Sequence, residues 1–386
     1  MPDGNGAVTA RIVEKIADIP AAVWDALAGP DNPFVSHAFL NALEETGCAT
    51  NRAGWLPHHL VIEETDGRIL AVAPLYLKSH SQGEYVFDHG WAHAWERAGG
   101  QYYPKMQVSA PFSPVGGPRL LAGDAPDSDD SRLALLRALE TVCTQMELSS
   151  VHVTFATEHE WKLMGAAGWI QRIGRQFHWH NRGYETFDDF LGELTSRKRK
   201  SIRKERRAIA DQGLIVRPYV GDDIRPSHWD AFYRFYVDTY DRKWGYPYLT
   251  REFFEAAQDR LGDRIVLMIA EMDAIPVAGA LNLQGSDALY GRNWGSRAEY
   301  PFLHFETCYY QAIDFAIANG LARVEAGTQG PHKVQRGYEP VETYSGHYIP
   351  NESFREAIEQ FCREEQREVE WEMEAIAERS PYRQAD

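Results

Sequence analysis

ILAVAPLYL at residues 69–77 and IPVAGALNL at residues 275–283 are similar apolar stretches in opposite halves of the 386-residue chain. Each stretch follows another apolar run, at residues 60–62 and 266–268, across a short polar turn. Two apolar runs joined by such a turn indicate a β-hairpin. The same hairpin is therefore predicted once in each half of the chain.

The elements predicted after the two hairpins also recur in the same order. In the first half they are a strand at residues 85–87, a helix at 133–146 and a strand at 151–155. In the second half they are a strand at residues 289–290, a helix at 302–319 and a strand at 323–326. The spacing from Gly168 to His178 is ten residues, and so is the spacing from Gly337 to His347. This repeat predicts an α/β fold of two tandem lobes, each a mixed, mainly antiparallel sheet flanked by helices. The order of elements is that of the acyltransferase fold called GNAT.

The predicted organisation has three parts. Residues 1–180 form lobe one, residues 181–213 form a basic helical connector, and residues 214–386 form lobe two. Lobe two ends in a long helix, because apolar residues recur at helical spacing over residues 353–379.

Composition places the chain among globular proteins, since 44% of its residues are hydrophobic and 25% are charged. The longest apolar runs fall far short of the ~20 residues that a bilayer requires, and the N-terminus does not resemble a signal peptide. The four cysteines lack CxxC spacing, and the histidines form no HExxH motif, so no metal site is predicted. We expect a cytoplasmic protein.

A local basic run contrasts with the net charge of −16. Residues 197–207 read RKRKSIRKERR, with eight basic residues and one acidic residue. A helix with cations on all sides suits RNA phosphates, whereas pairing with carboxylates elsewhere in the chain is the alternative. The candidate polyanion-binding residues are Arg197, Lys198, Arg199 and Lys200.

Several longer motifs resemble the FemAB-like branch of the Fem family of non-ribosomal peptidyltransferases. They are NPFVSHAFLNALE at 32–44, PFSPVGGPRLL at 111–121, LTSRKRKSIRKERR at 194–207, LYGRNWG at 289–295, LHFETCYYQAIDFA at 303–316 and GTQGPHKVQRGYEPVETYSGH at 327–347. The branch is described as peptidoglycan biosynthesis/recognition, and the resemblance covers nearly the whole chain. It implies two GNAT-like lobes and transfer of an acyl or aminoacyl group to an amine of a small or peptide-like acceptor.

The last of these motifs contains the candidate catalytic loop. It follows a predicted core strand, which is where α/β folds place their sites, and it contains His332, Lys333 and Arg336. Attack of an amine on an ester or thioester creates an oxyanion that a fixed cation stabilises. The resemblance implies a lysine in this role, so Lys333 is the first candidate and Arg336 the second.

The attacking amine must also lose a proton to a nearby base. The candidates are Glu325, His332, His304 and Glu306. Glu325 is predicted in a buried strand, where desolvation would raise its pKa, although a buried glutamate is as often the partner of an arginine. His304 and Glu306 lie where a helix begins, so capping is the alternative role for both.

Polar and aromatic residues near the predicted strand ends are candidates for substrate binding. They are Tyr290, Arg292, Trp294, His304, Glu306 and Gln329 in lobe two, with Trp91 and His89 in lobe one. The two residues of lobe one precede a long predicted loop at residues 92–130, and long loops on such scaffolds are often functional.

The acyl donor is predicted from the turn before the central helix of lobe two. GNAT enzymes that use acyl-CoA hold its pyrophosphate on a glycine-rich turn at this place. Residues 297–304 contain no glycine, carry Glu299, and include Pro301, which has no N–H. This disfavours acyl-CoA and favours the aminoacyl-tRNA donor that the resemblance to Fem enzymes implies. We expect no tightly bound cofactor. The alternatives are an acyl-CoA-dependent N-acyltransferase and a ligand-binding protein without catalysis.

Overall fold

Both halves of the chain contribute to each of two structural units. The computed structural model describes residues 8–242, 246–327 and 330–383. Unit 1 comprises Met1–Gly174 and Glu342–Val369, and unit 2 comprises Arg175–Val341 and Glu370–Asp386. The units therefore differ from the predicted lobes, which divide the chain at residues 180 and 213.

Unit 1 combines two sheets with several helices. Its elements are β1 (Val8–Val13), α1 (Ala21–Ala28), α2 (His37–Glu45), β2 (Trp55–Pro57), β3 (His59–Glu64), β4 (Ile69–Ala73), β5 (Leu75–Lys78), α3 (His89–Arg97), β6 (Lys105–Val108), α4 (Ser128–Gln145), β7 (Val151–Ala156), α5 (Glu158–Ala166), the start of β8 (Ile170–His180), the end of β14 (Glu339–Tyr348) and most of α12 (Glu352–Ala377). The predicted hairpin is β3–β4. Pro74 separates β4 from β5, so β4 joins the small sheet β1-β3-β4 while β5 joins the larger sheet.

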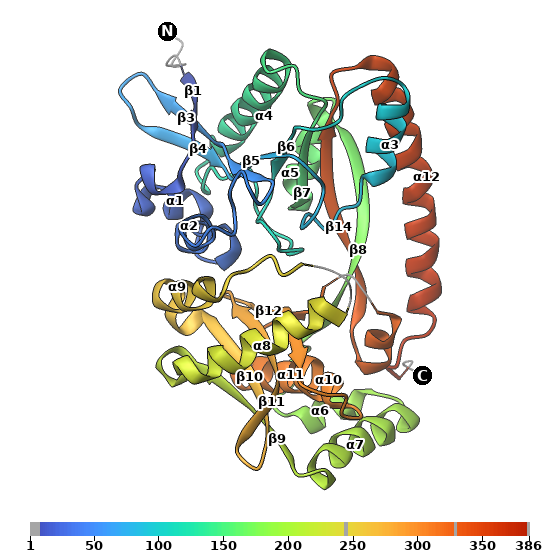
Figure 1. Ribbon diagram of the computed structural model, residues 1–386. Coiled ribbons are helices and arrows are strands. Elements are labelled where there is room, and N and C mark those ends of the chain that lie inside the picture. Colours follow the sequence, from blue (N-terminus) through green and yellow to red (C-terminus); the bar gives the residue numbers. More distant parts are fainter. Residues whose placement is uncertain (1–7, 243–245, 328–329, 384–386) are drawn as a thin grey trace. The chain divides into compact units, whose positions relative to one another are not determined.

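The core of unit 1 forms where α4 packs on the strands. Leu135, Leu136 and Leu139 of α4 are buried against Leu60 and Ala71 of the hairpin. These leucines lie on one face because a helix repeats every 3.6 residues. Figure 1 shows α4 beside β3 and β4. The core therefore rests on the pattern that predicted this helix.

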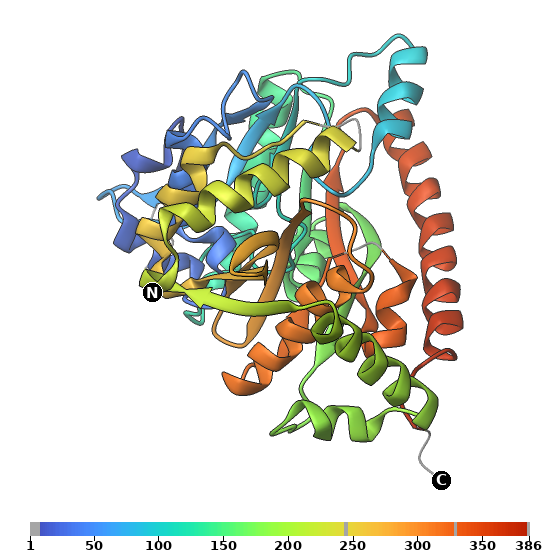
Figure 2. The same ribbon diagram turned by 60° about the horizontal axis from the view of Figure 1, so that its bottom comes forward.

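Unit 2 is built around the second predicted hairpin. Its elements are the end of β8, α6 (Phe187–Glu193), α7 (Ser196–Asp211), β9 (Leu214–Val220), α8 (Pro226–Arg242), α9 (Arg251–Leu261), β10 (Ile265–Met272), β11 (Ile275–Gln284), β12 (Ala288–Ser296), α10 (Leu303–Phe305), the π-helical turn Glu306–Tyr310, α11 (Gln311–Ala318), β13 (Arg323–Glu325), the 3₁₀ helix Pro331–Arg336, the start of β14 and the end of α12. The basic run forms helix α7, which follows α6 (green in Figure 2). The hairpin β10–β11 is antiparallel, as predicted.

The larger sheet has the same arrangement in each unit. Its strand order is β2-β5-β6-β7-β14 in unit 1 and β9-β10-β11-β12-β13-β8 in unit 2. Each unit has one parallel pair, β6–β7 in unit 1 and β12–β13 in unit 2. An antiparallel strand then follows, and it comes from the other half of the sequence: β14 in unit 1 and β8 in unit 2. The fold is α/β with two tandem GNAT-like lobes, and the lobes exchange one strand.

This exchange explains the repeated glycine-to-histidine spacing. His347 of β14 pairs in register with His152 of β7, and His178 of β8 pairs with Glu325 of β13. Each histidine therefore lies on the exchanged strand, opposite a residue of the parallel pair of its unit.

Two predictions for the first half were wrong. Residues 85–87 form no strand, and the residues after them form helix α3; the strand at this place in the sheet is β6, at Lys105–Val108. The predicted loop at 92–130 consequently contains most of α3 and all of β6. The polar residues Lys105 and Gln107 concealed this buried strand from a pattern search.

The central helix of unit 2 is interrupted by a π-helical turn. One turn of α-helix precedes Glu306–Tyr310, and α11 follows without a break. Such turns insert an extra residue and are frequent at functional sites. All helices in the described ranges are too short or too polar to cross a membrane.

Candidate functional site

The candidate site lies in unit 2, where β12 and β13 separate. The two strands pair only from Ala288 to Tyr290, because β13 ends at Glu325 while β12 continues to Ser296. A cavity of about 100 Å³ opens beyond this point. Its polar and aromatic lining residues are Asn282, Arg292, Asn293, Trp294, His304, Cys308 and Tyr309. The end of a parallel pair is a common ligand site in α/β folds.

A β-bulge in β12 shapes the wall of this cavity. Leu281 of β11 pairs with Asn293, and the next residue, Asn282, pairs with Gly291. Arg292 is therefore the extra residue of a β-bulge in β12, and a bulge of this kind redirects the side chains around it. The side-chain oxygen Oδ1 of Asn293 is buried and accepts no hydrogen bond from the described residues. Asn293 thus offers the cavity an unused polar atom.

A larger hollow of about 680 Å³ shares Trp294 and His304 with the small cavity. Its other lining residues include Thr239, Arg242, Ser296, Glu299, Tyr300 and Pro301. The turn that was predicted to face the acyl donor therefore borders a hollow that adjoins the small cavity.

Lys333 lies directly behind the cavity wall. Its ammonium donates to the carbonyl oxygens of Ala326, a lining residue, and Gly327, at 2.5 and 2.9 Å. The side chain is almost fully buried, and this burial lowers the pKa of Lys333 to about 8. Lys333 therefore fixes the backbone that follows β13 and places a positive charge next to the cavity.

Arg336 is held by α7. Its guanidinium donates to Glu205 Oε2 at 2.9 Å and lies over the ring of Phe305, 3.4 Å from the ring centroid. Tyr310 donates to the same carboxylate oxygen at 2.5 Å. The one acidic residue of the basic run thus joins the connector helix to the candidate catalytic loop.

The histidines of the site form one cluster of rings. His304 packs edge-to-face against Trp294 and Tyr309, with ring centroids 5.3 Å apart in both cases, and its centroid lies 6.1 Å from that of His332. His332 Nε2 lies 3.0 Å from the hydroxyl oxygen of Tyr309. The structure therefore brings together His304, His332 and Trp294, which the sequence had singled out separately.

The two glutamates are held by arginines. Glu306 Oε1 accepts from Arg206 of α7 at 3.1 Å, and burial raises the pKa of this carboxyl group. Glu325 Oε1 accepts from Arg323 at 3.0 Å. Arg323 also donates to the hydroxyl of Tyr290 at 3.3 Å. Glu306, Glu325 and Tyr290 are not among the residues that line the small cavity.

The predicted residues of lobe one lie in unit 1. His89 is exposed at the start of α3, whereas Trp91 is buried and packs against His347, with ring centroids 4.9 Å apart. Gln329, the remaining predicted substrate-binding residue, lies outside the described residues.

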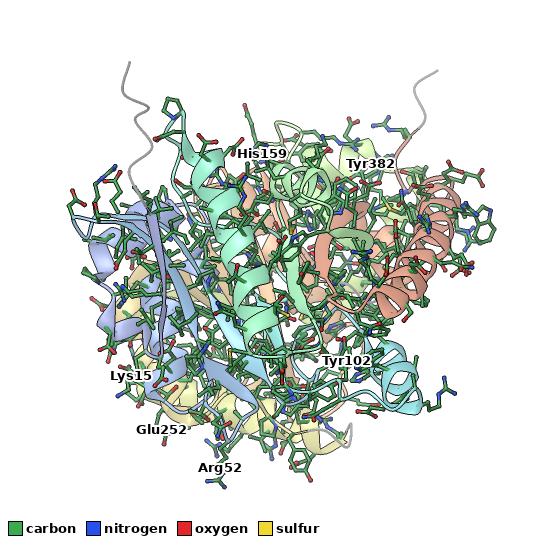
Figure 3. The ribbon with its side chains drawn as sticks, turned by 90° about the horizontal axis from the view of Figure 1, so that it is seen from above. Lys15, Arg52, Tyr102, His159, Glu252 and Tyr382 are labelled. Carbon is green, nitrogen blue, oxygen red and sulfur yellow. The ribbon has the colours of Figure 1, made fainter. Side chains whose placement is uncertain are left out.

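Unit 1 also contains a buried ionic cluster. The ammonium of Lys105 donates to Glu84 Oε2 at 2.7 Å and to Asp88 Oδ2. Tyr102, which is labelled in Figure 3, donates to the same Asp88 oxygen at 2.6 Å. Burial raises the pKa of Glu84 to about 7; burial would also raise that of Asp88, but Lys105 and His152 lower it below its ordinary value. The carboxylates were not singled out from sequence, because their partner Lys105 lies far along the chain.

The space beyond the parallel pair of unit 1 is filled by the chain itself. Gly117 donates its N–H to the carbonyl of Phe155 at 3.0 Å, and Arg119 Nε donates to that of Thr154 at 3.0 Å. Arg119 is fully buried, and its Nη2 donates to the carbonyl of Val115 at 2.5 Å. The motif at residues 111–121 therefore occupies, in unit 1, the place that the cavity has in unit 2.

The basic residues of α7 divide into two groups. Arg203 and Arg206 pair with acidic residues of unit 2. Arg197, Lys198, Arg199 and Lys200 form no ion pair with any residue in the described ranges. These four follow the N-cap Thr195, where positive charge opposes the helix dipole. Their position weakens the helix, so stability alone does not account for them.

Sequence reasoning did not single out Tyr309, which lies in the helix predicted at residues 302–319. The bulge had a visible signal, since Gly291 and Gly295 closely follow the strand predicted at residues 289–290. A Cβ atom at Gly295 would lie 2.3 Å from the carbonyl oxygen of Phe235 in α8. This glycine therefore permits the close approach of α8 to β12.

A repeated mixed sheet with a separating parallel pair defines a protein of the GNAT-type acyltransferase class. The chain belongs to the FemAB-like family, described as peptidoglycan biosynthesis/recognition, whose model matches residues 15–384. It is accordingly an acyl or aminoacyl transferase that acts on an amine. No curated protein sequence matches the chain.

Solved structures with the same fold have little sequence identity to the chain. FemX is 13% identical, with a TM-score of 0.56, over 88% of this chain and 98% of that one. The C-terminal domain of a putative lysylphosphatidylglycerol synthetase from Agrobacterium fabrum is 9% identical, with a TM-score of 0.56, over 90% and 96%. L-PGS from Bacillus licheniformis is 11% identical, with a TM-score of 0.52, over 87% and 98%. At these identities the likeness concerns the fold.

Proposed function

We propose that the protein transfers an aminoacyl group from aminoacyl-tRNA to an amine of a peptide-like, peptidoglycan-related acceptor, at the cavity of unit 2. Such a donor would place the reaction in the cytoplasm. The observation that carries the proposal is the turn that opens the central helix of unit 2, together with the unpaired cations of α7.

The turn offers few backbone donors to a pyrophosphate. Pro301 has no N–H, and the N–H of Leu303 donates to the carbonyl of Tyr300 at 3.2 Å. Phe302 stands at a positive φ of 67°, and α10 spans only three residues before the π-helical turn. Glu299 adds a negative charge to the hollow. A CoA pyrophosphate would therefore lack the N–H cradle that it ordinarily binds.

The cations of α7 suit a donor that carries many phosphates. Four of them stand in the first turns of the helix without a carboxylate partner in the described part of the chain. Each phosphate neutralised by such a residue releases counterions, which makes binding strongly dependent on salt. The same residues would contribute nothing to binding a small thioester in the cavity.

The test compares two donors with one acceptor. Transfer is measured from tRNA charged with a labelled amino acid and, separately, from labelled acetyl-CoA, to a muropeptide with a free amine. We expect labelled muropeptide from the charged tRNA alone. Transfer from acetyl-CoA alone would establish the acyl-CoA-dependent alternative, and binding of either donor without product would indicate a non-catalytic protein.

A charge-matched pair of variants tests the role of α7. In one variant Arg197, Lys198, Arg199 and Lys200 are replaced by Gln. In the control, four ion-paired cations elsewhere are replaced by Gln: Arg11, Arg68, Lys162 and Arg251. We expect the first variant alone to flatten the salt dependence of tRNA binding, by roughly 0.7 in the logarithmic slope for each single-strand phosphate that the protein no longer neutralises. Equal slopes in both variants would remove α7 from the account.

A further inference from the structure

Tyr309 connects the small cavity of unit 2 with His332. It belongs to the π-helical turn Glu306–Tyr310 and lines the cavity, while its hydroxyl oxygen lies 3.0 Å from Nε2 of His332. His332 belongs to the 3₁₀ helix that follows β13, and it is partly exposed. A proton that leaves the cavity through Tyr309 therefore has an acceptor beyond it.

The rings around this pair hold it in place. The ring of Phe305 lies 5.5 Å from that of His332, and Tyr338 packs edge-to-face on Tyr309 at 5.4 Å between ring centroids. His304 packs on the other rings of the cluster. Because both side chains are already held by packing, they lose little rotamer entropy when a substrate binds.

The charges near His332 keep its imidazole neutral. The charged or titratable groups that face it are Tyr309, His304, Lys333 and Arg336. Burial lowers the pKa of His332, and the positive charges of Arg336 and Lys333 lower it further. Burial also raises the pKa of Tyr309, so its hydroxyl keeps its proton. At neutral pH Nε2 can therefore accept a hydrogen bond from Tyr309.

Asn293 gives the same cavity an acceptor for an N–H group. Its buried Oδ1 is not hydrogen-bonded within the described ranges, and a buried acceptor without a donor is unfavourable. A primary amine would meet that need. The cavity volume of about 100 Å³ exceeds the ~30 Å³ share of one water molecule, so it accommodates the aminomethyl end of a side chain.

We propose that this cavity is the subsite for the acceptor's primary amine, that Asn293 Oδ1 orients the amine, and that Tyr309 relays its proton to His332. The inference rests on the proposed function, because it assigns the nucleophile's place in that transfer. It is independent of the donor, since the relay acts on the amine.

The proton balance is complete with these groups. The amine arrives as R–NH₃⁺; the Tyr309 oxygen takes one proton while its own proton passes to Nε2 of His332. The neutral amine then attacks the acyl carbonyl, so a C–N bond forms and the bond from the acyl carbon to the leaving oxygen breaks. A second amine proton goes to the leaving oxygen, and His332 releases the first one to water. No oxidant, reductant or metal takes part.

The test uses Tyr309→Phe with Tyr338→Phe as its matched control. Tyr338 is a buried neighbour whose hydroxyl has no hydrogen-bond partner in the described part of the chain. Replacement by Phe therefore removes no hydrogen bond and keeps the ring that packs on Tyr309. We expect Tyr309→Phe to lower kcat by about 10²-fold, within the range of general acid–base catalysis, and leave the KM of the donor unchanged. Tyr338→Phe should stay near the wild-type kcat. Equal rates for Tyr309→Phe and the wild type would overturn the relay.

The pH profile separates a relay from a structural effect. We expect wild-type kcat/KM to fall on the acid side of an apparent pKa below the ordinary imidazole value of 6.5. In His332→Gln this acid limb should vanish together with the fast rate. An unchanged acid limb in His332→Gln would contradict the assignment.

A measurement without turnover keeps the inference apart from the proposed function. At fixed pH, ethylamine is added to protein labelled with ¹⁵N-histidine, and the Nε2 resonance of His332 is followed. We expect a shift in the wild type and none in Tyr309→Phe. If neither donor gives product, the proposed function is wrong. If ethylamine does not shift the Nε2 resonance of His332 in the wild type, the amine subsite is wrong.

Discussion

The two units have the same strand arrangement but differ in what lies beyond their parallel strand pair. In unit 1 the segment around Arg119 fills this space, and its guanidinium donates to backbone carbonyls. In unit 2 the corresponding space is a cavity bordered by a β-bulge and a π-helical turn. The two units therefore share a strand arrangement, whereas the bulge, the π-helical turn and the cavity are found in unit 2.

The two units also differ in the partners of a buried lysine. In unit 1 Lys105 is buried with two carboxylates that depend on it for compensation. In unit 2 Lys333 is buried with two carbonyl oxygens, which carry no net charge. The charge of Lys333 is therefore not already neutralised by a carboxylate contact in the described part of the chain. The comparison predicts that Lys105 serves stability and that Lys333 serves transfer.

The largest effect is expected on stability when Lys105 is replaced by Met. The change removes the cation that contacts both Glu84 and Asp88 and leaves Glu84 with Lys78 alone, whose ammonium lies 3.8 Å from Glu84 Oε1. Removal of one partner from a buried ion pair costs about 3–5 kcal/mol. We expect the free energy of unfolding in urea to fall by about this amount. Lys333→Met should lower it by less, since no charge loses its partner. Equal losses in the two variants would break the comparison.

Lys333→Met should have the second largest effect, on the rate of transfer. The loss of one group that stabilises an oxyanion lowers kcat by about 10²–10³-fold. Arg336→Met serves as the comparison, because Arg336 forms an ion pair with Glu205. We expect this replacement to raise KM more than it lowers kcat. If Arg336→Met loses kcat while Lys333→Met keeps it, the two roles are exchanged.

The smallest effect concerns the pH dependence of stability in unit 1. Burial lowers the pKa of His152 to about 3, whereas the unfolded chain titrates near 6.5. The unfolded state therefore binds more protons below pH 6.5, and stability falls as the pH is lowered, by up to about 1.4 kcal/mol per pH unit for this histidine.

The measurement for this prediction is the free energy of unfolding between pH 5 and 7. His152→Gln should reduce the slope of this free energy against pH, on the acid side, by up to the contribution of one bound proton. His159→Gln is the control, since His159, which is labelled in Figure 3, is exposed on α5 and pairs with Asp129. A slope that falls equally in both variants would show that burial of His152 is not its cause.

The repeat in the sequence predicted the fold because hairpins and central helices are local patterns. The hairpins, the helices of both halves and the strands β7 and β13 were confirmed. The exchange of β8 and β14 was not predicted, since local apolar patterns do not identify the partner of a strand. The repeated histidine spacing was its only trace, and the register of His178 and His347 gives that spacing its meaning.

The candidate site was predictable in its residue types and not in its geometry. The sequence identified His304, His332 and Trp294, but their ring cluster depends on a π-helical turn that has no simple sequence pattern. The orphan oxygen of Asn293 results from a one-residue bulge, which the two glycines of β12 only hinted at. Composition and motifs therefore predicted which residue types lie at the site. They did not predict its geometry, because that depends on strand register and on irregularities in a helix.

The most direct test of the account is a crystal structure with an aminoacyl-adenosine analogue in which an amide replaces the reactive ester. The analogue stands for the end of a charged tRNA and cannot be transferred. We expect its aminoacyl group beside Trp294 and Asn293 in unit 2, with the adenosine in the larger hollow bordered by Tyr300. An analogue bound beside β6 and β7 of unit 1, or a unit 2 cavity left without it at saturating concentration, would contradict the account.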